Sequence, residues 1–134
     1  MKVALDTNVI VSAVATRGLC ADLFRLIIAE HELVLGETVF RELRQVLAKK
    51  VRVPTETVEE LEAYLRRQAT VVPTPPKMSR KGLDSADAAV LAEAEAGAAD
   101  VLVTGDQRLL EATESSVRVV SPRGLWDLIR RSPG

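Results

Sequence analysis

Short apolar runs separated by longer amphipathic segments limit the folds open to this chain more than any other feature of its sequence. The runs "KVAL" at 2–5, "ELVLG" at 32–36 and "VLV" at 101–103 contain almost no polar residues. A strand with one face in water alternates apolar and polar residues, whereas a strand that helices cover on both faces does not. Because these runs alternate with helical patterns, we predict an α/β fold with three α/β/α layers and a mainly parallel central sheet.

The spacing of apolar residues predicts where each element begins and ends. The segment "PTPPKMSRKG" at 73–82 is the one clear loop, because it is rich in proline and basic residues. Thr55 is a candidate cap for the helix that follows it, and Pro122 suits the first turn of the last helix. We expect helices over 8–16, 20–30, 37–49, 55–69, from about 85, over 107–113 and from 122, and strands over 2–5, 32–36, 70–72, 100–103 and 117–120.

Composition indicates a globular protein, in which any anionic partner must be held by local basic patches. Hydrophobic residues make up 47% of the chain and charged residues 28%, and the formal net charge of −1 provides no global field for nucleic acid or a membrane. The single cysteine, Cys20, fits a reducing compartment. Asp6 and Asn8 interrupt an N-terminal apolar run that otherwise imitates a signal peptide. We expect one domain over residues 1–134, a cytoplasmic location and no membrane span.

Acidic residues stand where the predicted strands end. Asp6 follows the first strand, and Asp106 follows "VLV" after Thr104 and Gly105. In a parallel sheet such positions meet at the carboxyl edge, where binding sites form. We expect Gly105 to let the backbone turn tightly there. The structural alternative is that each aspartate only caps a helix.

Two further aspartates, Asp84 and Asp87, open the alanine-rich helix of "DSADAAVLAEA". Asp84 could cap that helix, and Asp87 could be the acidic third residue of a capping box. However, helical spacing places Asp87 above the apolar positions Val90, Leu91 and Ala94. An acid at the end of a buried stripe needs a partner.

Glu42 is the most informative acid in the helix predicted over 37–49. The apolar residues of this helix form a continuous arc, and Glu42 lies at its edge, three residues after Val39 and four before Val46. The alternative is a surface glutamate paired with a neighbouring arginine. Glu37 is the competing acid, but it lies in the first turn, where the helix dipole alone would favour it.

These carboxylates would repel one another at one edge of a sheet, and burial would raise their pKa values unless a cation held them. The set contains only oxygen ligands, which suits Mg²⁺ or Mn²⁺ and does not suit zinc. We interpret the lone His31 as a helix-end residue, not as a ligand. The sequence therefore predicts a magnesium or manganese site.

Four segments in order, "LDTNVIVSA", "RELRQVL", "DSADAAVLAEA" and "VLVTGDQRLL", resemble the PIN domain, a metal-dependent ribonuclease fold, and in particular the VapC-like toxins of toxin–antitoxin pairs. The resemblance covers essentially the whole chain. It implies that Asp6, Glu42, Asp87 and Asp106 form the catalytic and metal-binding quartet, with Thr7 or Asn8, Thr104 and Asp84 as supporting residues. One departure is Gly36-Glu37, where relatives often carry Ser-Pro or a similar cap.

The resemblance also implies a single-stranded RNA substrate, a cognate antitoxin protein and a homodimer. Phosphate contacts are expected from Lys77, Arg80, Lys81 and Arg108, although a solvated basic loop is the structural alternative. The apolar residues of helices 20–30 and 55–69 would either fill the core or form a groove for an antitoxin helix. These apolar residues are Leu23, Ile27, Val58, Leu61, Tyr64 and Leu65, and the last helix could add Leu125, Trp126, Leu128 and Ile129.

Three other functions compete with the nuclease as explanations of these acids. A receiver-like domain needs a lysine after its last strand, and "VRVVSPRG" has none. A haloacid-dehalogenase phosphatase needs Asp-x-Asp after its first strand, whereas this chain has Asp-Thr-Asn. The third is a catalytically weak PIN-like scaffold that binds RNA or protein. The intact set of acids argues against that scaffold.

Overall fold

The computed structural model describes residues 1–76, 80–112 and 114–131. Its strands form one sheet of five, in the order β3-β2-β1-β4-β5, and every neighbouring pair is parallel. The predicted α/β class and parallel sheet are therefore confirmed. The strands are β1 (Lys2–Leu5), β2 (Glu32–Gly36), β3 (Ala69–Val72), β4 (Val101–Val103) and β5 (Arg118–Val120).

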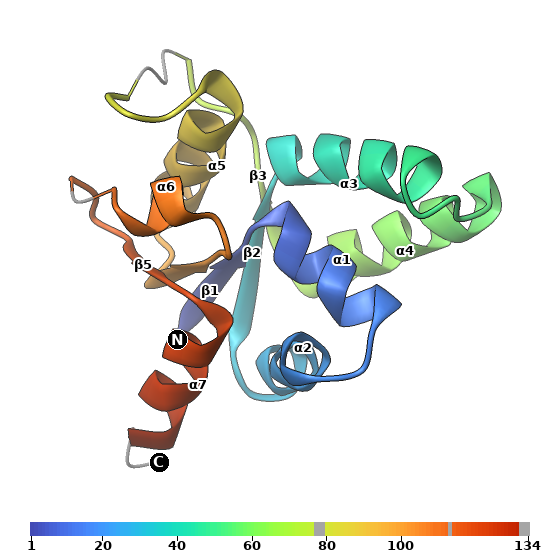
Figure 1. Cartoon of the computed structure of the whole chain (residues 1–134), viewed down its shortest axis with the longest axis horizontal. Helices are drawn as coiled ribbons and strands as arrows, with labels where there is room; N and C mark the ends of the chain where they lie inside the picture. Colours follow the sequence, from blue (N-terminus) through green and yellow to red (C-terminus); the bar gives the residue numbers. More distant parts are fainter. Residues whose placement is uncertain (77–79, 113, 132–134) are drawn as a thin grey trace.

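Helices flank this sheet on both sides. Figure 1 shows α1 to α4 (blue to green) on the right of the strands and α5 to α7 (yellow to red) on the left. For α1 to α6, which connect strands, this division follows from the strand order, because right-handed crossovers in opposite directions along a sheet place their helices on opposite faces. Helix α7 follows the last strand and contacts α2. The helices are α1 (Thr7–Ala15), α2 (Leu19–Glu30), α3 (Glu37–Lys49), α4 (Thr55–Gln68), α5 (Ser85–Ala96), α6 (Gln107–Leu110) and α7 (Pro122–Arg131).

The apolar runs form the centre of the molecule. Leu33, Val34 and Leu35 in β2 and all three residues of β4 are no more than 3% exposed. Leu23, Ile27, Val58 and Leu65 of α2 and α4 are also buried in this core, while Leu61 and Tyr64 pack partly buried against it. For these buried residues the structure favours the core interpretation over a free groove.

The last helix packs against the body of the fold. It contacts α2 and β5, and its Leu125 is fully buried. Trp126, Leu128 and Ile129 pack against the core while partly buried. No helix among the described residues is long and apolar enough to cross a membrane.

Three local predictions need correction. Helix α6 ends at Leu110 and not at 113, so it is a single turn. Thr55 is the first residue of α4 and does not cap it, because Pro54 occupies the cap position. Gly105 has no positive φ, and a side chain there would meet nothing within 4 Å. The turn after β4 is instead closed by Thr104 Oγ1, which accepts the Asp106 N–H at 3.0 Å.

Candidate active site

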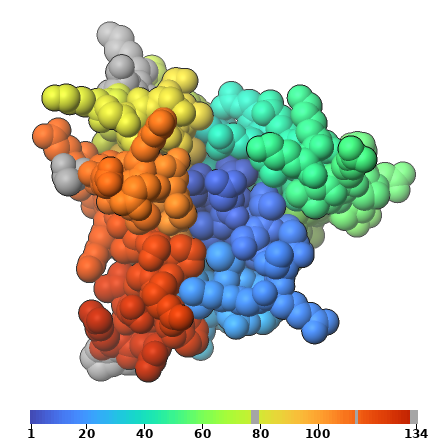
Figure 2. Space-filling view, in the orientation of Figure 1, coloured from blue at the N-terminus to red at the C-terminus, as the bar shows by residue number. Residues whose placement is uncertain are grey.

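The candidate site lies where the order of the strands reverses. The central strand β1 has β2 on one side and β4 on the other, and crevices form at the carboxyl ends of such strands. The carboxyl ends of β1 and β4 carry Asp6 and Asp106, and α3 and α5 begin near the same edge (Figure 1). In Figure 2 the start of the chain (dark blue) is visible between α3 (teal), the segment before α5 (yellow) and the α6 region (orange).

Asp6 is fixed by hydrogen bonds to both of its carboxylate oxygens. Its Oδ1 accepts the Thr7 N–H at 2.8 Å, which caps α1, and its Oδ2 accepts the Thr104 hydroxyl at 2.7 Å. Asp6 is only 7% exposed, and Thr104 is fully buried. Because Thr104 Oγ1 also accepts the Asp106 N–H, this one hydroxyl links the ends of β1 and β4 and aligns the two acids.

Glu42 reaches the same edge from α3. The buried Thr7 donates its hydroxyl to Glu42 Oε1 at 2.9 Å and its N–H to Asp6, so this one residue joins Asp6 and Glu42. Glu37 lies elsewhere, because both of its oxygens accept the Arg66 guanidinium of α4, at 2.8 and 3.0 Å. This ion pair lowers the pKa of Glu37. The structure thus places Glu42, and not Glu37, beside Asp6.

Asp84 and Asp87 lie at the start of α5. Asp84 caps the helix by accepting the Asp87 N–H at 2.8 Å, as the structural alternative predicted. The caps at Asp6 and Asp106 also form, and Asp106 Oδ1 accepts the Arg108 N–H at 2.9 Å. Capping therefore accounts for one oxygen of each of these three aspartates. It does not account for Asp87, whose side chain has no hydrogen-bond partner among the described residues.

The acids perturb one another electrostatically. Burial, followed by the charges of Asp84, Asp106, Asp6 and Glu42, raises the pKa of Asp87 from 3.8 to about 6. Burial also raises the pKa of Glu42, against the bond from Thr7, and the charges of Asp6 and Asp84 raise it further. The pKa of Asp6 is raised mainly by burial, although the bonds from Thr104 and Thr7 oppose this. All five carboxylates therefore share one electrostatic site.

This donor set fits a hard divalent cation. The acids are oxygen donors held by hydroxyls, and their repulsion would be relieved by a positive charge between them. Among the described residues, no three acidic, histidine or cysteine side chains are close enough to surround an ion by themselves. Mg²⁺ keeps several of its waters and binds through one or two carboxylates, so acids that do not surround an ion by themselves still suit it.

Comparison with known proteins identifies the family. A sequence model of the PIN domain matches residues 2–108, which is most of the chain. The chain belongs to the PIN-domain family. No curated protein sequence gives a significant match.

Solved structures show the same fold at low sequence identity. PAE2754 from Pyrobaculum aerophilum is 20% identical, with a TM-score of 0.68 over 98% of this chain and 91% of that one. VapBC2 from Rickettsia felis, bound to a DNA fragment from its promoter, is 15% identical with a TM-score of 0.67 over 90% and 98%. DNA-bound VapBC from Salmonella typhimurium is 19% identical with a TM-score of 0.66 over 91% and 98%.

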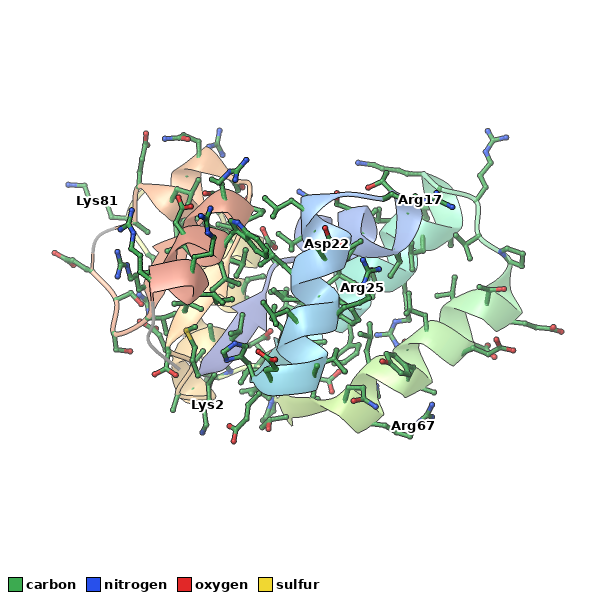
Figure 3. All side chains as sticks on the ribbon, turned by 90° about the horizontal axis from the view of Figure 1, so that it is seen from below. Lys2, Arg17, Asp22, Arg25, Arg67 and Lys81 are labelled. Carbon is green, nitrogen blue, oxygen red and sulfur yellow. The ribbon has the colours of Figure 1, made fainter. Side chains whose placement is uncertain are left out.

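The basic residues predicted to hold phosphates lie in different settings in this PIN domain. Arg80 contacts Glu95 and donates to the Glu114 carbonyl at 3.0 Å, so its guanidinium ties the loop to its neighbours. Lys81 is exposed and is directed outward, at the opposite end of the view from Arg67 (Figure 3). Arg108 is exposed at the start of α6. Lys77 lies outside the described residues.

Among the residues predicted to orient the acids, some contact the acids and others do not. Thr7 and Thr104 are buried and each donates to an acid of the quartet, as expected of orienting residues. Asn8 is exposed on α1, and Thr7 makes the contact for which both were candidates.

Glu93, a buried acid of α5, was not predicted from the sequence as a structural or functional residue. It is 1% exposed and accepts the Thr38 N–H at 3.0 Å and the hydroxyls of Thr38 and Thr74 at 2.6 and 2.5 Å. Glu93 thereby caps α3 from another helix. Gly36 is required here, because a Cβ at this position would lie 1.9 Å from Glu93 Oε1. The signal was the departure at Gly36, where the expected cap side chain is absent.

Proposed function

We propose that this PIN domain is a metal-dependent endoribonuclease that hydrolyses single-stranded RNA. One observation carries the proposal: acids from four separate elements meet at the carboxyl edge of the sheet, and three of them have raised pKa values. Retaining such repulsion has a cost in stability, and strongly perturbed acids of this kind are typical of functional sites. The proposed quartet is Asp6, Glu42, Asp87 and Asp106.

Mg²⁺ or Mn²⁺ would supply charge to neutralise the scissile phosphate and would lower the pKa of a coordinated water. In the reaction, a water oxygen forms a bond to phosphorus and a carboxylate accepts the proton of that water. The bond to the leaving ribose oxygen breaks, and this oxygen takes up a proton from solvent water. We assign Asp6 and Asp87 as the direct ligands. Glu42 and Asp106 would act through water or a second ion, and one of them would orient the attacking water.

The supporting hydroxyls suit this assignment. Thr7 occupies only Oε1 of Glu42, so Oε2 is left able to accept a proton or a hydrogen bond. Thr104 holds Asp6 Oδ2 and the Asp106 backbone together, which limits the rotation of both side chains. Pre-orienting acids in this way lowers the cost of organising them when the substrate binds.

We infer further that the protein is the toxin of a type II toxin–antitoxin pair. Support comes from the VapBC complexes from Rickettsia felis, Salmonella typhimurium and nontypeable Haemophilus influenzae, which share the fold. A cognate antitoxin would lay a helix across the toxin, and a homodimer is expected. Light scattering on the purified chain, and capture of the product of the adjacent gene, test these two partners. A monomer that does not bind this product would be a solitary nuclease.

The nuclease proposal is tested by RNA cleavage in Mn²⁺ and in EDTA. The unmodified protein should cut only with metal, and Asp87→Asn should not cut at all. Asp22→Asn is the matched control, because Asp22 lies on α2 in an exposed ion pair with Arg25 (Figure 3). Equal cleavage by the protein and by Asp87→Asn would indicate a contaminating nuclease.

A metal titration separates the enzyme from a scaffold of the same fold. Calorimetry should show weak Mn²⁺ binding by the unmodified protein and its loss in Asp6→Asn. A protein that binds RNA without binding Mn²⁺ would be the catalytically weak scaffold. Unchanged Mn²⁺ binding by Asp6→Asn would remove Asp6 from the site.

A further inference from the structure

A hollow opens between α3 and α5 beside the acids. Its volume is about 420 Å³, which falls within the range of ligand pockets. Arg41, Glu42 and Gln45 line it from α3, and Ser85 and Ala89 line it from α5. Because Glu42 also belongs to the acidic site, the hollow adjoins the position at which the scissile phosphate would lie.

Arg41 is the basic side chain of this hollow, and a chain of hydrogen bonds holds it there. Its Nη2 donates to the hydroxyl oxygen of Thr38 at 3.3 Å. Thr38 in turn donates this hydroxyl to the fully buried Glu93, which also accepts from Thr74. A buried network that satisfies all of its polar groups is rigid. One nitrogen of the exposed Arg41 guanidinium is therefore tied to this buried network.

Two other arginines of this region, Arg44 and Arg66, already form ion pairs with glutamates. Arg44, one turn along α3, pairs with Glu62 of α4 at 3.4 Å. Arg66 pairs with Glu37 and Glu62. Arg41 forms no ion pair among the described residues, although its charge slightly lowers the pKa of Glu42. The Arg41 side chain is exposed. Because it is exposed and forms no ion pair among the described residues, its guanidinium is available to an anion.

We propose that this hollow is the subsite for the nucleotide adjoining the cleaved phosphodiester, and that Arg41 binds the phosphate of that nucleotide. The proposal rests on the proposed ribonuclease function. Because Glu42 lines both the acidic site and the hollow, an RNA strand whose scissile phosphate lies at the acids can place one neighbouring nucleotide in the hollow. A guanidinium is suited to this contact, because its planar fork matches the phosphate oxygens.

The test compares Arg41→Gln with Arg44→Gln. The two arginines are exposed, lie three residues apart on one helix and carry the same charge, but only Arg41 lines the hollow. Binding of a short fluorescein-labelled single-stranded RNA of mixed sequence is measured by anisotropy over a range of salt concentrations. Both variants are made in the Asp87→Asn background, so that the RNA stays intact.

We expect Arg41→Gln to weaken RNA binding about tenfold, as for the loss of one charge-assisted hydrogen bond. The slope of log K against log salt should become less negative by about 0.7, which corresponds to one lost phosphate contact on a single strand. Arg44→Gln should change the affinity less than about twofold. In the otherwise unmodified protein, Arg41→Gln should leave the Mn²⁺ affinity unchanged.

Three results would overturn the subsite: equal effects of the two variants, no RNA binding by the parent protein, or a loss of Mn²⁺ affinity in Arg41→Gln. The last result would make Arg41 a counter-ion of Glu42. Cleavage assays keep the two proposals separate. RNA binding that depends on Arg41 in a protein that cuts no RNA would retain Arg41 as an RNA contact and refute the nuclease, and with it the role of the hollow beside a cleaved bond. Cleavage at low RNA concentration that ignores Arg41→Gln would retain the nuclease and refute the subsite.

Discussion

Replacing Asp87 with asparagine should stabilise the metal-free protein at neutral pH. The folded state raises the pKa of Asp87 from 3.8 to about 6, chiefly through burial and then through the charge of Asp84. An acid with a raised pKa contributes stability that is fully present below 3.8 and is lost as the pH rises through about 6. Above this range the ionised carboxylate opposes folding, whereas asparagine stays neutral.

The magnitude follows from the size of this pKa change. A difference of one in pKa is worth about 1.4 kcal/mol, so the change at Asp87 sets a ceiling of about 3 kcal/mol. Asp87 is only partly buried, and solvent screening reduces the expected gain to about 1 kcal/mol. At about pH 3, below both pKa values, the carboxylate is mostly protonated in both states, so the difference between variant and parent should nearly vanish.

Urea unfolding in EDTA, repeated at several pH values, measures this difference. Asp22→Asn is the control and should change the free energy of unfolding by less than about 0.5 kcal/mol at every pH, because its ion pair is exposed. Adding Mn²⁺ should reverse the order, since a ligand stabilises only the folded protein that binds it. A variant that is destabilised at neutral pH in EDTA would refute the argument that the ionised Asp87 carboxylate opposes folding.

Three further outcomes are expected. Glu42→Gln should abolish cleavage at nearly unchanged stability, while Glu37→Gln should cut RNA normally; cleavage rates and urea midpoints check both. Thr7→Val should slow cleavage about tenfold, because Glu42 loses the hydrogen bond to Oε1, and unchanged rates would show that this bond does not position Glu42. Gly36→Ala should lower the free energy of unfolding by at least about 2 kcal/mol, since the new methyl group meets Glu93, whereas Gly105→Ala should stay within about 1 kcal/mol.

The elements were predictable because their signals are local. A strand covered on both faces reads as an apolar run, and an amphipathic helix repeats its apolar residues with a fixed spacing. For this reason β1, β2 and α3 were predicted with the bounds that the structure gives. Short elements were less certain. Helix α6 was predicted to be too long, because a single turn has too few residues to show the spacing of apolar side chains that marks a helix.

The location of the candidate acids was also largely predictable. Asp6 and Asp106 could be placed because the carboxyl ends of parallel strands share one edge, and Glu42 because it lies at the edge of an apolar arc. Their catalytic roles stay predictions. The caps at Asp6, Asp84 and Asp106 also formed as the structural alternative expected, so capping and membership of the acidic site are not exclusive.

By itself, the sequence determined the α/β class and the edge at which the acids gather, because both follow from patterns between near neighbours. Only the tertiary structure decided which groups hold those acids. Thr104 reaches Asp6 across 98 positions, Thr7 reaches Glu42 across 35, and Glu93 caps α3 across 55. Whether such distant groups meet depends on how helices pack on the sheet, to within the reach of a hydrogen bond. A pattern between near neighbours in the sequence does not specify which distant groups come into contact. For this reason the contacts of Glu93 and Arg41 are seen only in the folded chain.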